Sequence, residues 1–153
     1  MDWRHLFLGF DGRISRRKFW LGFGALALVE LFILSLAASE AKIDLGKGLA
    51  PQWFRNLSLA IDAVFAWPLA AVLAKRFQDR NYPPVIAWYV VAALVVYSIF
   101  DAFGALQTAD SFTLLGHLLS WPLMALSIAV LVETGFRRGT EGPNTYGPDP
   151  LQE

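Results

Sequence analysis

Four long runs of apolar residues dominate the pattern of hydrophobic and polar positions along the chain. They extend over residues 19–39, 53–74, 84–106 and 112–134. Each is about 20 residues long, and a helix of that length spans the ~30 Å hydrocarbon core of a bilayer at ~1.5 Å per residue. None of the runs alternates with a period of two, which argues against transmembrane strands. We therefore predict an all-α integral membrane protein, a bundle of four transmembrane helices.

The polar segments between the runs fit this prediction. Residues 40–51 and 107–111 are polar links, and residues 80–84 contain two adjacent prolines that end one helix and start the next. Residues 135–153 form a polar tail. We expect the chain, residues 1–153, to form a single membrane domain without a separate soluble domain.

Composition excludes several other classes of protein. The 153 residues are 56% hydrophobic and only 17% charged, which leaves too little polar surface for a soluble four-helix bundle. The net charge of zero argues against a nucleic-acid binder. The absence of cysteine removes thiolate metal sites, and two histidines are too few for a multi-histidine site. We expect no metal, no cofactor and no nucleic-acid partner.

The positive charges are distributed unevenly about the four predicted spans. Ten of the 13 Lys and Arg residues lie in the N-terminal segment, in the link after the second span or in the tail. Since positive residues are retained on the cytoplasmic side of a membrane, both termini are predicted to be cytoplasmic.

The segment before the first span carries several features of a membrane boundary. Gly12 permits a tight turn, Ser15 can cap the following helix, and Trp20 suits the interfacial belt. Arg13 and Arg16 belong to a basic cluster that suits anionic headgroups. The alternative is that this cluster only anchors the topology.

An apolar face precedes that boundary. Trp3, Leu6, Phe7 and Phe10 recur with the spacing of one face of a helix. This spacing predicts either a short helix lying in the plane of the membrane interface or a frayed terminus.

Three motifs lie in order along the chain: GRISRRKFW at residues 12–20, KRFQDR at 75–80 and GPNTYGPDP at 142–150. Together they resemble the bacterial family catalogued as domain of unknown function 805, the YhaH-like proteins. Gln78 replaces a histidine of the family pattern, whereas Asp79 retains its place. The resemblance implies a small multi-span protein of the bacterial inner membrane and no established activity.

By the charge distribution, the three motifs share the predicted cytoplasmic face. Asp79 is placed to pair with Arg13 or Arg16, and the tail to fold back over them. The alternative is three separately solvated motifs. The candidate residues of this face are Gly12, Arg13, Ser15, Arg16, Trp20, Arg76, Asp79, Asn144, Tyr146, Gly147, Pro148 and Asp149.

Four ionisable residues lie at membrane depth. Glu30, Asp62, Asp101 and His117 all fall in the outer half of the predicted bundle when depth is counted from the rise per residue. Ionisable groups at this depth are costly and often mark a site. They predict either a proton- or cation-coupled site or hydrogen bonding between helices by neutral acids.

These features lead to three functional hypotheses. The leading one is a non-catalytic membrane module whose basic face binds anionic lipid or a protein partner, including a second copy of the chain. The alternative is a small transporter or channel subunit that uses the intramembrane acids. The third is a membrane enzyme acting on lipid-linked substrates, although the sequence offers no catalytic motif.

Overall fold

The computed structural model describes residues 2–43, 50–108 and 111–151. Within these ranges the chain is helical and forms no strand. The elements, in order, are α1 (Trp3–Leu8), α2 (Arg16–Glu40), α3 (Gln52–Asp79), α4 (Val85–Ala102), α5 (Leu114–Leu131) and the π-helical turn η1 (Val132–Phe136). The predicted links at residues 40–51 and 107–111 lie partly outside the described residues.

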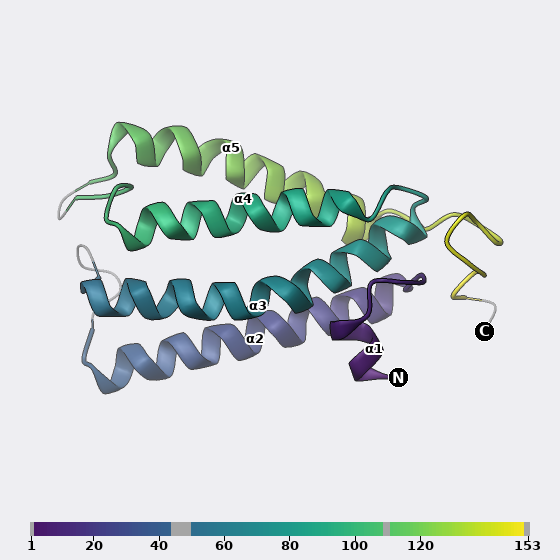
Figure 1. The fold of residues 1–153 in the computed structure, drawn as a ribbon, viewed down its shortest axis with the longest axis horizontal. Helices are drawn as coiled ribbons and strands as arrows, with labels where there is room; N and C mark the ends of the chain where they lie inside the picture. Colours follow the sequence, from purple (N-terminus) through teal and green to yellow (C-terminus); the bar gives the residue numbers. More distant parts are fainter. Residues whose placement is uncertain (1, 44–49, 109–110, 152–153) are drawn as a thin grey trace.

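The four long helices run side by side along the long axis of the molecule, each in the opposite direction to the one before (Figure 1). The first and last described residues lie at the same end, close to the C-terminal end of α3. This end contains residues 10–20, 75–80 and 135–151, and we call it the motif end. All three sequence motifs therefore meet at one end of the bundle.

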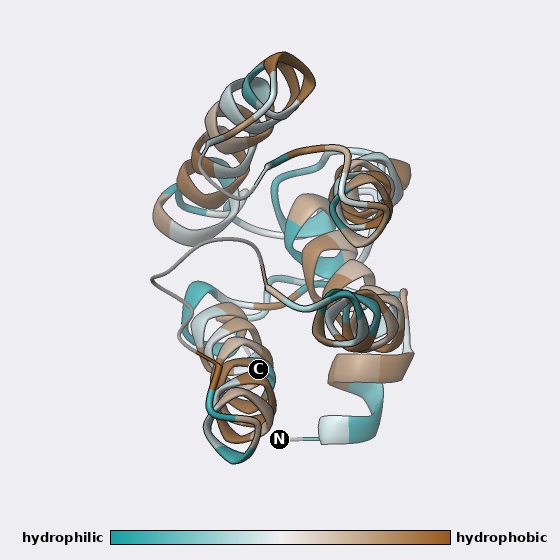
Figure 2. Cartoon of the chain, turned by 90° about the vertical axis from the view of Figure 1, so that its left-hand side faces the viewer, coloured by the Kyte–Doolittle hydropathy of each residue, from teal (hydrophilic) through white to brown (hydrophobic). Residues whose placement is uncertain are grey.

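Apolar residues occur along all four long helices (Figure 2). The segments Arg16–Glu40, Gln52–Asp79, Val85–Ala102 and Leu114–Phe136 are each long and apolar enough to cross a membrane. Each also carries large apolar side chains that face outward, such as Leu28 (69% exposed) and Val64 (70% exposed). Because such a surface is stable in lipid but not in water, the chain has the character of a multi-pass membrane protein. The all-α prediction is confirmed.

Two helices end at other residues than the approximate spans predicted from the sequence. The second span was predicted to end at residue 74, but α3 continues to Asp79. The helix ends there because Asn81 adopts a φ of +60° and two prolines follow it. The third span was predicted to reach residue 106, but α4 ends at Ala102. Gly104 there adopts a φ of +72° and donates its N–H to the carbonyl of Asp101 at 2.8 Å.

Side chains cap three of the helices at their N-termini. The Asp2 carboxylate accepts the N–H of Arg4 at 2.9 Å, and the Thr113 hydroxyl accepts the N–H of Gly116 at 2.9 Å. Ser15 caps α2, as predicted, by accepting the N–H of Lys18. These bonds satisfy backbone donors that have no partner within the helix.

The tightest packing of the protein lies at the motif end. In α3, ten consecutive residues from Ala70 to Asp79 are buried, whereas most of the helix before them is partly exposed. The buried apolar cluster comprises Leu6, Ile14, Phe19, Ala70, Val72, Leu73, Ala74, Phe77, Ala87, Val90 and Val91. The helices are thus held together most firmly where the motifs lie.

The N-terminal segment is part of this packing. The predicted helix is present as α1, and Leu6 is only 3% exposed in the apolar cluster shared with α3. The Phe10 ring packs against two tryptophans that also contact each other, with centroids 5.1 Å from Trp67 and 5.2 Å from Trp88. Much of the apolar face that suggested an interfacial helix is therefore turned toward the bundle itself, and Trp3 remains half exposed.

Two phenylalanines of α2 provide a matched test of this packing. Phe19 is fully buried, whereas Phe32 is 66% exposed on the same helix. We expect Phe19→Ala to lower the free energy of unfolding by ~3–5 kcal/mol, because it leaves a cavity in the packed end. Phe32→Ala should change it by much less, since that side chain faces the surroundings. Thermal unfolding of both variants in the same detergent measures the difference; equal losses would contradict the packing described above.

Candidate functional site

Arg13 occupies the centre of the motif end. Gly12, with φ of +87°, turns the chain just before it. The Arg13 guanidinium donates to an Asp79 carboxylate oxygen at 3.1 Å and to the carbonyls of Thr140 at 2.6 Å, Gly142 at 2.7 Å and Gly147 at 3.2 Å. Its side chain is 1% exposed. One buried cation thus ties the N-terminal segment to α3 and to the tail.

Asp79 pairs with a second arginine as well. Its other carboxylate oxygen accepts from Arg76, three residues earlier on α3. The sequence left Arg13 and Arg16 as possible partners of Asp79, and the structure selects Arg13. We call Arg13, Asp79 and Arg76 the arginine clamp. Its three side chains are almost completely buried. Because a buried charge without a partner is costly, each of them needs the hydrogen bonds and ion pairs that the others provide.

The end of α3 also holds the chain that follows η1. Arg76 donates to the carbonyls of Thr134 and Arg137. Arg80 forms an ion pair with Glu133 at 2.8 Å and donates to a backbone carbonyl two residues beyond η1. Both arginine side chains are therefore engaged in connecting α3 to the tail.

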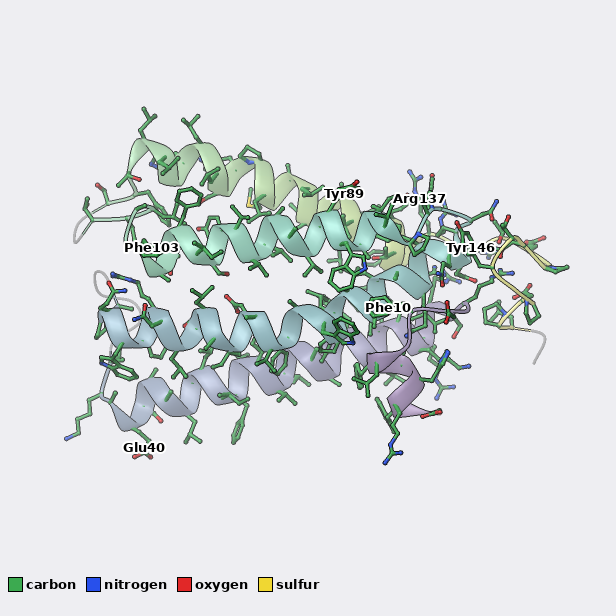
Figure 3. All side chains as sticks on the ribbon, in the orientation of Figure 1. Phe10, Glu40, Tyr89, Phe103, Arg137 and Tyr146 are labelled. Atoms are coloured by element: carbon green, nitrogen blue, oxygen red, sulfur yellow. The ribbon has the colours of Figure 1, made fainter. Side chains whose placement is uncertain are left out.

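The tail folds into a compact turn against this end. The Asn144 side chain donates to the carbonyl of Gln78 at 2.9 Å, and its oxygen accepts the N–H of Tyr146 at 2.8 Å. Asn144 and Gly147 exchange backbone hydrogen bonds across the turn, with Gly147 at φ of +133°. Tyr146 and Arg137 both belong to the motif end (Figure 3). The proline at position 148 is exposed.

Asp149 fastens the end of this turn. Its carboxylate accepts the backbone N–H groups of Leu151 and Gly142, each at 3.0 Å. These two donors, Leu151 first and then Gly142, lower the pKa of the Asp149 carboxyl below its usual value because they stabilise the charged form. Asp149 therefore remains ionised and closes the tail as a loop of about eight residues.

Close approach between segments requires glycine at two places. A Cβ atom on Gly139 would collide with the Asp79 carboxylate. A Cβ atom on Gly135 would lie 2.7 Å from the ring of Trp20, whose indole N–H donates to the Gly135 carbonyl at 3.1 Å. The arginine clamp therefore requires glycine at position 139, and the contact between Trp20 and η1 requires glycine at position 135.

Several of these residues were not predicted from the sequence. They are Lys75, Arg80, Gly135, Gly139 and Thr140. Lys75 is fully buried and donates to the carbonyls of His5, at 2.7 Å, and Gly9. Lys75 and Arg80 lie inside the KRFQDR motif, so the motif itself was a usable signal. The glycines and Thr140 act through backbone contacts that leave no pattern in the sequence.

A cavity of about 660 Å³ lies between the start of α2 and the tail. Its lining includes Ser15, Arg16, Arg17, Trp20, Arg76, Asp79, Phe136, Arg138, Asp149 and Leu151. The guanidinium of Arg16 donates to the carbonyl of Phe136 at 3.2 Å, and the ring of Trp20 contacts that of Phe136 with centroids 5.4 Å apart. The cavity thus combines arginine side chains with an aromatic wall.

Of the four ionisable residues predicted at membrane depth, two come together. Glu30 and Asp62 line one cavity of about 200 Å³ with Ser98, whose hydroxyl donates to Asp62 at 2.5 Å. Asp101 instead accepts from Gln107 at 3.3 Å. The fourth, the histidine at position 117, lies beside an aromatic ring of the adjoining link and outside the cavity lining. Among the described residues no group of three or more His, Cys, Asp and Glu side chains could hold a metal ion.

Removing the charge of Asp79 tests the arginine clamp. We expect Asp79→Asn to lower the free energy of unfolding by ~3–5 kcal/mol, because two buried guanidinium groups lose their counter-ion. The tail should also become more sensitive to protease. The control is Glu133→Gln, which removes an acid from a partly exposed pair and should cost ~1 kcal/mol or less. Unchanged stability and proteolysis in Asp79→Asn would contradict the clamp.

Comparison with known proteins supports the resemblance seen in the motifs. Residues 7–148 match the family described as a protein of unknown function (DUF805). The uncharacterized protein YiiR of Escherichia coli K12 is 29% identical over 146 residues, which cover 92% of this chain and 84% of YiiR. YiiR of Escherichia coli O157:H7 has the same identity and coverage. No solved structure matches the chain. The chain belongs to the DUF805 family.

Proposed function

We propose that this chain is a non-catalytic protein of the bacterial inner membrane, with both termini in the cytoplasm, whose motif end binds anionic lipid. The observation that carries the proposal is that three arginines at the cavity are exposed and lack an ion pair among the described residues. Arg16, Arg17 and Arg138 are exposed there, and none of the three forms an ion pair with another described residue. Within the described residues their charge is not neutralised by an ion pair, so it can attract an anion.

The other arginines of this end serve a different purpose. Arg13, Arg76 and Arg80 are occupied by Asp79, Glu133 and backbone carbonyls. This internal bonding holds the exposed arginines on a firm support. Because the backbone that carries these arginines is already held in place, it loses little conformational entropy when a ligand arrives, which favours affinity.

The position of the three arginines along the helices also supports the proposal. Arg16 and Arg17 begin α2, and Arg138 follows η1, so all three lie at the ends of apolar segments of membrane-spanning length. In a bilayer this is the level of the headgroups, where a basic side chain contributes ~1 kcal/mol of attraction to an anionic surface. Trp20 is likewise placed for the interfacial belt.

The enzyme hypothesis gains little support. A cleft that holds Arg13, Arg16 and Asp79 together would favour an enzyme. Arg13 does not line the cavity, since the tail encloses it, and the Asp79 carboxylate is already engaged by two guanidinium groups. An acid in that state is poorly placed to transfer protons during a reaction.

Lipid enrichment around the protein tests the proposal. The full chain is placed in nanodiscs of phosphatidylcholine and phosphatidylglycerol, and the lipid that stays with the protein after detergent extraction is quantified. We expect phosphatidylglycerol to be enriched, less so at high salt, and the enrichment to disappear when Arg16, Arg17 and Arg138 are all changed to Gln. Lys42→Gln, at the opposite end of α2, is the control and should retain it. No enrichment in the unaltered protein would overturn the proposal.

A second candidate function rests on the cavity between α2, α3 and α4. Glu30, Asp62 and Ser98 share it inside segments that are otherwise apolar. Carboxyl groups at such depth commonly serve proton or cation movement, which keeps open a role as a small transporter or channel subunit. The same groups are equally suited to hydrogen bonding between the helices.

Proton flux into proteoliposomes tests this second candidate. If the cavity carries protons, the unaltered chain should dissipate an imposed pH gradient and Asp62→Asn should abolish that activity. Asp101→Asn is the matched control, because that acid lies outside the cavity and bonds to Gln107. Flux no greater than in empty liposomes would rule the candidate out.

A further inference from the structure

We propose that the cavity between the start of α2 and the tail is a discrete site for one phosphate group of a lipid headgroup. This inference rests on the proposed function and goes further, because it assigns the anion to one cavity instead of to the basic surface in general. The cavity of about 660 Å³ is large enough for a glycerophosphate headgroup.

The cationic groups reach the cavity from two separate segments. Arg16 and Arg17 come from the first turn of α2, and Arg138 comes from the chain that leaves η1. Arg16 donates one nitrogen to the Phe136 carbonyl, which orients its guanidinium and leaves further N–H groups available. Arginine is well suited here, since its planar donors match the oxygens of phosphate.

Three acids also line the cavity, and the carboxylates of two of them are already bonded to groups of the protein. Asp79 is held between two guanidinium groups of the clamp. Asp149 accepts two backbone N–H groups of the tail. The third, Glu141, is exposed to solvent. The charge of the exposed arginines is therefore not compensated by Asp79 or Asp149, and an entering phosphate would meet that charge.

The opposite part of the lining is apolar, and this points to a lipid. Trp20, Phe136 and Leu151 line the cavity and are 38%, 61% and 81% exposed. Phosphate contacts with arginine beside an exposed aromatic wall suit a molecule with a charged head and an apolar body. A free phosphate ion would use only the arginines and would leave the apolar wall without a partner.

The walls of the cavity are held in place by contacts that do not involve the proposed ligand. Trp20 bonds to the Gly135 carbonyl, and Arg76 bonds to the Thr134 carbonyl on the inner side. The Arg138 backbone is held by Arg80, which leaves the Arg138 side chain free to face the cavity opening. Changing that side chain alone should therefore spare the fold.

A stoichiometric binding experiment tests the site. The full chain in phosphatidylcholine nanodiscs is titrated with phosphatidic acid, and retained lipid is counted by native mass spectrometry. We expect one phosphatidic acid to be retained per chain, and Arg138→Gln and Arg17→Gln each to weaken its retention by about tenfold or more. The control is Arg4→Gln, which removes the same charge from an exposed position on α1, outside the cavity, and should change retention by less than about fivefold. The thermal midpoint of each variant is measured in parallel.

The possible outcomes separate this inference from the proposed function. If Arg4→Gln weakens retention as much as Arg138→Gln, the discrete site is overturned, while binding to the basic surface stands. If no anionic lipid is preferred over phosphatidylcholine, both fail. A parallel titration with inorganic phosphate identifies the source of the anion. If inorganic phosphate competes at the same concentration as the lipid, the lipid assignment is overturned. Its failure to compete supports a site that also needs the apolar part of the ligand.

Discussion

The pairing of one buried carboxylate with two buried guanidinium groups is the constraint on which the rest of this structure depends. Asp79 balances only one of the two positive charges of Arg13 and Arg76, so backbone carbonyls must satisfy the remaining donors. Carbonyls in the interior of a helix are already used there, so the acceptors come from helix ends such as Thr134 and from non-helical chain. The Gly- and Pro-rich tail is not helical, and it directs several carbonyls inward at Arg13. The composition of the tail therefore suits the clamp.

This constraint divides the molecule into two parts with different physical requirements. The motif end is packed by buried side chains and charge-assisted hydrogen bonds, so its geometry is closely specified. The rest of the bundle exposes apolar side chains over most of its surface, which suits lipid but provides fewer internal contacts. Within that part, the Asp62–Ser98 hydrogen bond is one of the few polar links between helices. The rigid end is accordingly the better place for a specific binding site.

The sequence predicted those features that depend on local pattern. Apolar length predicted the four long helices, and Ser15 predicted a helix start. The shared face of the motifs predicted that Asp79 pairs with Arg13 or Arg16, and the structure shows Arg13. Features that depend on direction in space were not predictable in the same way. Counting residues placed Asp101 and Asp62 in the same half of the bundle. It gives no information about which way a side chain faces around its helix, and of the two acids only Asp62 lines the cavity. Likewise, nothing in the sequence marks Gly139 as a residue that touches a carboxylate.

The structure also separates the positive charges of the chain into buried and exposed groups. Counting Lys and Arg residues treats every one as equivalent for membrane orientation. In the folded protein, Lys75 and Arg76 are fully buried and donate to backbone carbonyls or to Asp79, so their charges serve internal structure. Arg16, Arg17 and Arg138 are exposed and form no ion pair with another described residue. The number of charges that can act on a bilayer is therefore smaller than the sequence count. Because these three converge on one cavity, their effect is concentrated at one place instead of being spread over the surface.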